Sequence, residues 1–135
     1  MLFRSVPGMT KVFHGGAKRI SVPDLTKSGA TSGIAEEGRA FWVTPSQESA
    51  LGFGKLASET PAISAFGFTP KNPLTIEFPV KSILDGSFGQ LKIDALNKAR
   101  KAGHDAVIFK QAGNLKLLED EIAVLDPSVL KSLQR

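Results

Sequence analysis

The chain has 135 residues, enough for one domain of ordinary size and too few for two. It has no cysteine, which excludes disulfides, thiolate metal sites and a cysteine nucleophile, and its two histidines lack a partner at ligand spacing, so we expect no metal. The net charge of +4 suits an anionic partner such as a nucleotide, a nucleic acid or an acidic protein. No apolar run is long enough for a bilayer span or a secretory signal, which predicts a soluble protein without a membrane partner.

The first part of the chain alternates short extended segments with glycine-rich sequence. Residues 11–14 (KVFH) indicate a β-like segment that ends at two glycines, and the following stretch, rich in Gly, Ser, Thr and Lys, indicates a loop. Residues 39–44 (RAFWVT) are aromatic and β-favouring and predict a strand. The TPSQ sequence that begins at Thr44 is a capping box with proline at the first helical position, and it predicts a helix over residues 45–57.

The middle of the chain predicts two strands and a helix. Residues 63–68 and 74–78 indicate strands joined by a turn that contains two prolines and an asparagine. Between residues 90 and 102 the apolar and small residues recur at helical spacing. Gly103 stands where the C-terminal cap of this helix belongs.

The last part of the chain predicts two buried strands, residues 105–110 (DAVIFK) and 121–125 (EIAVL), joined by a loop with glycine and asparagine. Asp and Pro at residues 126–127 open a short terminal helix. The order of the elements predicts a strand-rich α+β fold in which residues 1–135 form a single domain.

Three segments place polar groups at the edge of a predicted strand. The VFHGG segment puts His14 beside two glycines, which would let a flat ligand approach the backbone, although a turn histidine is the plain alternative. The FWVTPSQESA segment offers aromatic rings and then helix hydroxyls, a pattern also typical of a core strand. The EDEIAVLD segment puts Glu119 and Glu121 on one face of an extended segment, where an acidic pair can also be merely solvated.

Together and in this order, the three segments resemble the ADP-ribosyltransferases of the His-Tyr-Glu class, which includes the poly(ADP-ribose) polymerases and the diphtheria-toxin-like enzymes. The chain looks most like the small phage and bacterial domains of this superfamily, through ARKAGHDAVI (residues 99–108) and DPSVLKS (residues 126–132). The resemblance covers residues 12–132. It implies an ADP-ribosyltransferase-like split, mixed β-sheet with flanking helices, which binds NAD⁺ as substrate and uses no metal.

The resemblance also implies how NAD⁺ would be held. His14 would hydrogen-bond the adenosine-side ribose, and the backbone of Gly15 would hold the nicotinamide carboxamide together with Ser49. Phe41 takes the position of the family's triad tyrosine, and Phe53 lies near that of the second ring, which stacks on nicotinamide. This chain has no tyrosine, so Phe41 supplies the ring without the hydroxyl.

Two glutamates match the catalytic end of the family. Glu121 corresponds to the catalytic glutamate, and a carboxylate suits the positive charge that develops on the ribose as the nicotinamide bond breaks. We expect its side chain to face solvent at the start of a strand. Glu119 resembles the first glutamate of the Glu-x-Glu loop of arginine-modifying members, which implies a role in binding the acceptor.

The resemblance therefore implies an NAD-dependent ADP-ribosyltransferase with a macromolecular acceptor, a protein or alternatively a nucleic acid. It suggests a toxin or phage effector in the cytoplasm of a bacterial or phage-infected cell, with an immunity or antitoxin partner. An NAD glycohydrolase would use the same residues, and a non-catalytic NAD-binding or interaction module would keep the same fold. A fourth alternative is a small basic ribonuclease-like toxin that uses His14 and His104 as acid and base.

Overall fold

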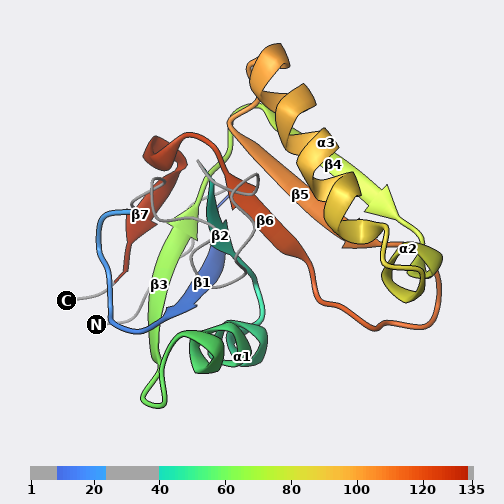
Figure 1. Cartoon of the computed structure of the whole chain (residues 1–135). Helices are drawn as coiled ribbons and strands as arrows, with labels where there is room; N and C mark the ends of the chain where they lie inside the picture. The colour runs from blue at the N-terminus through green and yellow to red at the C-terminus, as the bar shows by residue number, and fades with distance from the viewer. Residues whose placement is uncertain (1–8, 24–39, 134–135) are drawn as a thin grey trace.

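The computed structural model describes residues 9–23 and 40–133, which form a small α+β domain with two β-sheets (Figure 1). The first sheet is antiparallel, and its strands are, in order, β1 (Thr10–Gly16), β3 (Ala62–Phe68) and β7 (Leu130–Ser132). The strands of the second sheet are, in order, β2 (Phe41–Val43), β6 (Glu121–Val124), β5 (Ala106–Gln111) and β4 (Pro73–Phe78). In the second sheet β4 and β5 are parallel, and the other pairs are antiparallel.

The two sheets are joined by one isolated bridge between β1 and the residue that follows β2. The N–H of Phe13 donates to the carbonyl of Thr44 at 2.8 Å, and the N–H of Thr44 donates back to the carbonyl of Phe13 at 2.9 Å. We call this bridge, with its neighbours His14, Gly15 and Phe41, the junction. Strands β1 and β2, which carry most of the junction, lie near the middle of the domain in Figure 1.

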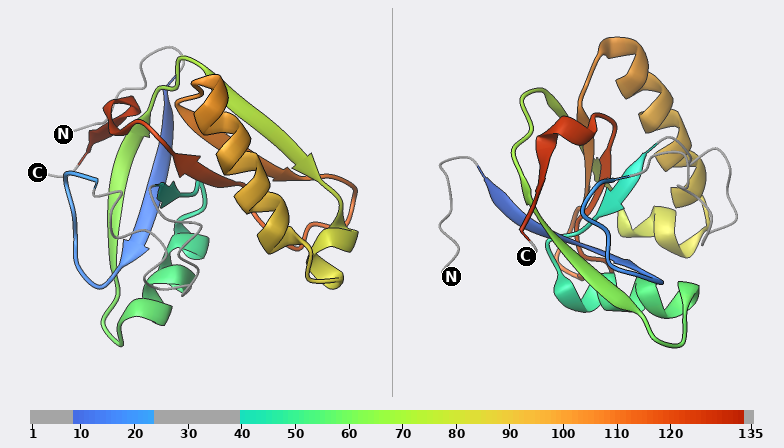
Figure 2. Two further views of the ribbon diagram at one scale, coloured as in Figure 1. Left: turned by 45° about the horizontal axis from the view of Figure 1, so that its top comes forward. Right: turned by 90° about the vertical axis from the view of Figure 1, so that its left-hand side faces the viewer.

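The helices cover different sheets. Helix α1 (Gln47–Ala57) packs on β1 and β3, and α3 (Phe88–Ala102) lies along β4 and β5 on the side away from the first sheet (Figure 2). The short α2 (Val80–Leu84) precedes α3 in the crossover that a parallel strand pair requires. A 3₁₀ turn, η3 (Pro127–Val129), leads into β7. Among the described residues, no helix is both long and apolar enough to cross a membrane.

Two hydrophobic cores bury the second sheet on both faces. The inner core lies between the two sheets and includes Val12, Phe41, Val43, Phe66, Phe68, Ala106, Ile122, Val124 and Val129. The outer core lies between the second sheet and α3 and includes Ala40, Phe78, Ala95, Leu96, Ala99, Val107, Phe109 and Ala123. Successive side chains of a strand point to opposite faces, so odd and even positions of β2 enter different cores.

The strongest local sequence signals are confirmed. Helix α3 has Ala95, Leu96 and Ala99 on its buried side, and it begins two residues before the predicted start. Gly103 ends the helix in the left-handed conformation, with φ of 80°, which glycine adopts without the steric cost of a Cβ. The carboxylate of Asp126 caps η3 by accepting the N–H of Ser128 at 3.0 Å, although the predicted terminal helix is only this 3₁₀ turn.

The start of α1 differs from the prediction. The N-cap is Ser46, whose Oγ accepts the N–H of Ser49 at 3.1 Å, and the helix begins at Gln47. The capping box predicted at Thr44 is wrong because Thr44 pairs with β1 and its hydroxyl donates to the carbonyl of Asp120. The Oγ1 of Thr44 accepts the N–H of Ser46, which precedes the helix, and so it does not cap the first turn.

The end of β1 and two short elements also differ from the prediction. β1 continues through Gly15 and Gly16, which pair with Ile63 and Ala62, so the glycines do not end the strand. Helix α2 and strand β7 were not predicted, because segments of five and three residues carry too little periodicity. The loop predicted after β1 and the Arg39 end of the predicted strand fall largely outside the described residues.

Candidate active site at the junction of the two sheets

His14 extends from β1 toward β2 and is fixed on two sides. Its Nδ1 lies 2.9 Å from the carbonyl oxygen of Trp42, and its ring stacks on Phe41 with centroids 4.3 Å apart and planes 21° apart. A carbonyl can only accept, so Nδ1 carries the proton, which leaves Nε2 as an acceptor in the neutral ring. A Cβ at Gly16 would lie 3.3 Å from Nε2, so the glycine keeps this nitrogen from being crowded.

The environment of His14 favours the neutral ring. Burial lowers the pKa of His14 below the ordinary value of 6.5, and the hydrogen bond to the Trp42 carbonyl offsets this only in part. His14 is therefore neutral at neutral pH and can accept a hydrogen bond from a hydroxyl through Nε2. This fits the contact with a ribose hydroxyl that the resemblance implies.

The backbone of Gly15 lies where the two sheets part. Backbone groups alternate between the two edges of a strand, so the N–H and C=O of Gly15 point to the same edge as those of Phe13, toward β2. If the ladder continued beyond the bridge, Gly15 would pair with Trp42. Instead the Trp42 carbonyl accepts from His14, so Gly15 presents a donor and an acceptor side by side at this edge of β1.

The absence of a side chain at Gly15 is required by α1. A Cβ at Gly15 would lie 1.6 Å from the carbonyl oxygen of Ala50, so only glycine allows the helix to pack this closely on β1. The sequence suggested instead that the glycines would let a flat ligand approach the backbone. That interpretation is wrong for the face of Gly15, which α1 covers, and it stays a prediction for the strand edge.

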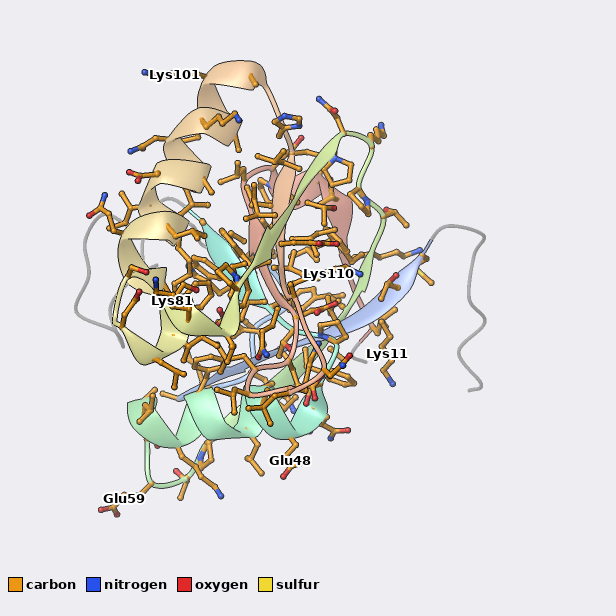
Figure 3. All side chains as sticks on the ribbon, turned by 90° about the vertical axis from the view of Figure 1, so that its right-hand side faces the viewer. Lys11, Glu48, Glu59, Lys81, Lys101 and Lys110 are labelled. Carbon is orange, nitrogen blue, oxygen red and sulfur yellow. The ribbon has the colours of Figure 1, made fainter. Side chains whose placement is uncertain are left out.

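Helix α1 carries Ser49 and Phe53 one turn apart, on the same side of the helix. Ser49 is half-buried and precedes Ala50, whose backbone carbonyl lies against Gly15. Phe53 is 46 % exposed and therefore keeps much of its ring free. Glu48, beside Ser49, points away from the body of the domain (Figure 3).

Phe41 is a core residue. It is 5 % exposed, and besides its contact with His14 it meets the ring of Phe66 edge-on, with centroids 5.7 Å apart. Phe41 is therefore both a core-strand residue and part of the candidate site, because its ring supports His14 from the inner core. It has no broad exposed face for a ligand.

Glu121 begins β6, and its side chain lies on the face of the second sheet that points away from the inner core. Its neighbour Ile122 enters the inner core, whereas Glu121 pairs with Phe109, whose ring belongs to the outer core. The structure therefore does not set Glu121 face to face with His14. The expectation of a solvent-facing carboxylate is wrong, because Glu121 is half-buried and its Oε2 is shielded from solvent.

Glu119 is exposed and lies in the loop before β6, outside the strand that Glu121 begins. Between the two glutamates, Asp120 forms ion pairs with Lys110 at 3.7 Å and with Lys116 at 3.6 Å. Pairs this exposed contribute little stability, typically about 0–1 kcal/mol. At the base of the loop, Gln111 accepts the N–H groups of Leu117 and Leu118 and fixes the backbone leading to Asp120.

Thr44 belongs to the site but was not predicted as a site residue. It is 3 % exposed, and it connects β1, the start of α1 and the residue before Glu121. The TPSQ motif drew attention to Thr44 in the sequence, but it indicated a helix cap rather than a site residue.

The two histidines lie in different settings. His14 bonds to the carbonyl of Trp42, whereas Nδ1 of His104, just beyond α3, lies 3.0 Å from the carbonyl of Asn72. Within the described residues no contact joins them, and no group of three or more His, Asp or Glu side chains could hold a metal ion. A surface hollow of about 590 Å³ lies on the outer side of α3, where Lys101 points outward (Figure 3), and it includes none of the predicted site residues.

No family model, no curated protein and no solved structure matches the chain. The geometry of the junction therefore carries the functional inference.

Proposed function

We propose that this chain binds NAD⁺ at the junction, cleaves the bond between nicotinamide and ribose, and transfers ADP-ribose to a macromolecular acceptor. The observation that carries the proposal is the edge of β1 at Gly15. There a backbone donor and acceptor stand beside the acceptor nitrogen of a neutral His14 and the first turn of α1. The two joined sheets with flanking helices are compatible with the split-sheet fold that the sequence resembles.

The chemistry of nicotinamide matches this edge. A carboxamide has one acceptor and two donors, so the N–H and C=O of Gly15 can bind it with two hydrogen bonds. Ser49 offers a further hydroxyl, and Phe53 offers a ring on which the pyridinium can stack. Nε2 of His14 accepts from a ribose hydroxyl. These groups bind and orient NAD⁺ without taking part in bond making.

The reaction breaks the bond between the ribose C1′ and the pyridinium nitrogen. The electron pair stays with nitrogen, nicotinamide leaves as a neutral molecule, and positive charge develops on the ribose. The carboxylate of Glu121 stabilises that charge through a ribose hydroxyl. The acceptor then forms a bond to C1′ and loses a proton; when the acceptor is water, the product is free ADP-ribose.

Incubation of the protein with labelled NAD⁺, alone and with a bacterial lysate, tests this proposal. Release of nicotinamide with label on a macromolecule supports a transferase. Release with free ADP-ribose only would assign the chain as a glycohydrolase. No release, from protein shown to be folded, would overturn the enzymatic proposal.

A non-catalytic NAD⁺-binding module is the second candidate. The observation that favours it is Phe41, which takes the place of the family's tyrosine but is buried and lacks a hydroxyl. Calorimetry with NAD⁺ separates the two candidates. Binding without nicotinamide release would support the module.

A further inference from the structure

Thr44 is a buried polar residue. All of its polar groups have partners, and these partners lie on three different parts of the site. Its backbone N–H and C=O pair with Phe13, next to His14 on β1. Its Oγ1 donates to the carbonyl of Asp120 at 2.8 Å and accepts the N–H of Ser46 at 3.2 Å. One residue therefore connects the strand that carries Gly15 through its backbone, and the helix that carries Ser49 and the strand that begins at Glu121 through its side chain.

We propose that Thr44 is a positioning residue that fixes the carboxylate of Glu121 relative to the NAD⁺-binding edge of β1. This inference rests on the proposed function. Glu121 lies on the face of the second sheet that carries the outer core, whereas the ring of His14 stacks on Phe41 of the inner core. The backbone at Asp120, next to Glu121, is tied to β1 and α1 through Thr44.

Only a hydroxyl can make both contacts at this position. Serine and threonine oxygens donate one hydrogen bond and accept others, whereas valine has the same shape and does neither. A Thr44→Val variant therefore keeps the volume and the backbone bridge to Phe13. It leaves the carbonyl of Asp120 and the N–H of Ser46 without their partner, so both segments are free to shift. Misplacement of a catalytic group by about 1 Å can reduce turnover by roughly 10²-fold.

The chain offers a matched control. Ser82 is also buried, at 4 % exposure, and its Oγ donates to the carbonyl of Pro79 at 2.7 Å in α2. Ser82→Ala removes a hydroxyl-to-carbonyl bond of the same kind without touching β1, α1 or β6. Thr44→Ser is the conservative variant, because it restores both contacts of the hydroxyl.

The first experiment measures nicotinamide release from NAD⁺ by the wild-type protein and the three variants. We expect Thr44→Val to lower kcat by about tenfold or more, with KM changed by less than about threefold. Thr44→Ser should recover most of kcat, and Ser82→Ala should keep the wild-type value. A wild-type kcat in Thr44→Val, or an equal loss in Ser82→Ala, would overturn the inference.

The second experiment does not depend on activity. Amide hydrogen exchange and amide chemical shifts are measured for the same proteins without NAD⁺. In Thr44→Val we expect exchange at the Ser46 amide to rise about tenfold and the Glu121 amide resonance to move, with neither change in Ser82→Ala. If the wild-type protein releases no nicotinamide, the proposed function fails, and unchanged Ser46 and Glu121 amides would separately refute the role of Thr44.

Discussion

The Nδ1 of His14 donates a hydrogen bond to the carbonyl of Trp42. The amide of Gly15 would donate to this same carbonyl if β1 and β2 continued as a ladder beyond the bridge. The imidazole thus separates the two strands one residue beyond the Phe13–Thr44 bridge. A single side chain both ends the pairing and leaves the backbone of Gly15 available at the edge. The two sheets therefore part at the residues that form the candidate site.

Gly15→Ala should strongly destabilise the domain. The added Cβ would lie 1.6 Å from the Ala50 carbonyl, and because this atom is backbone, α1 as a whole would have to move. We expect a loss of roughly 1–3 kcal/mol or more in the free energy of unfolding, measured by urea denaturation. Gly52→Ala, in α1 itself, is the matched control, because nothing lies within 4 Å of the position that its added Cβ would take. It should add up to about 1 kcal/mol through helix propensity. Equal effects of the two variants would contradict the close packing.

Stability should decrease as the pH falls below about 6.5, because of His14. Burial lowers its pKa in the folded protein, so between the folded and unfolded pKa values the unfolded chain binds more protons. The contribution is complete above the unfolded pKa and is lost as the pH falls toward the folded pKa. The carboxyl groups of Asp85 and Asp126, whose pKa values are held low by hydrogen bonds from Ser87 and Ser128, act in the same direction only in much stronger acid.

Urea midpoints measured from pH 5 to pH 8 test this pH dependence. His14→Gln should flatten the curve in this range, whereas His104→Gln, which removes the other histidine, should leave the slope in place. A curve that stays steep in His14→Gln would assign the slope to another group.

The elements that sequence predicted well are those set by local interactions. The apolar positions of α3 and the cap at Gly103 lie within one continuous segment, so the pattern contains the evidence. Strand β7 could not be predicted, because its three residues form a strand only through pairing with residues 66–68, far away in the chain. Thr44 was misinterpreted for the same reason: its decisive partner, Asp120, is 76 positions away.

For the candidate site, the structure brings some of the predicted residues into contact, but the sequence did not predict how all of them are oriented. The resemblance named His14 and Phe41, and their rings are in contact. The side of the sheet on which Glu121 lies depends on the register of β6 against β5, which no local pattern encodes.

Substitutions at Phe41 should act first on stability. Phe41→Ala removes a ring that is 5 % exposed and supports His14, so we expect a loss of roughly 3–5 kcal/mol. Phe41→Tyr must place a hydroxyl in the inner core and should cost about 1–3 kcal/mol. Urea denaturation measures both changes. A Phe41→Tyr protein as stable as wild type, with faster nicotinamide release, would show that the hydroxyl reaches the proposed site.

Glu121→Gln should preserve the fold and reduce nicotinamide release. The amide has nearly the same size as the carboxylate, so packing beside Phe109 is retained while the negative charge is lost. Electrostatic groups of this kind typically contribute about 10²–10³ in rate. Glu119→Gln is the control: this residue is exposed and outside the strand, so hydrolysis should persist even if transfer to an acceptor is lost. Undiminished release by Glu121→Gln would remove Glu121 from the mechanism.

The last prediction concerns the open ring of Phe53. Phe53 is 46 % exposed and Leu56, on the same helix, is 73 % exposed, so truncating either to alanine should change stability little. Only Phe53 lies one turn from Ser49 on the side proposed to receive nicotinamide. Stacking contributes about 0.5–1.5 kcal/mol beyond burial, so Phe53→Ala should weaken NAD⁺ binding by roughly 2- to 10-fold. Leu56→Ala should leave the Kd unchanged. Calorimetry with NAD⁺, and with nicotinamide alone, measures both variants. Equal losses would mean that α1 contributes general apolar surface rather than a stacking ring, and an unchanged Kd in Phe53→Ala would place the nicotinamide elsewhere.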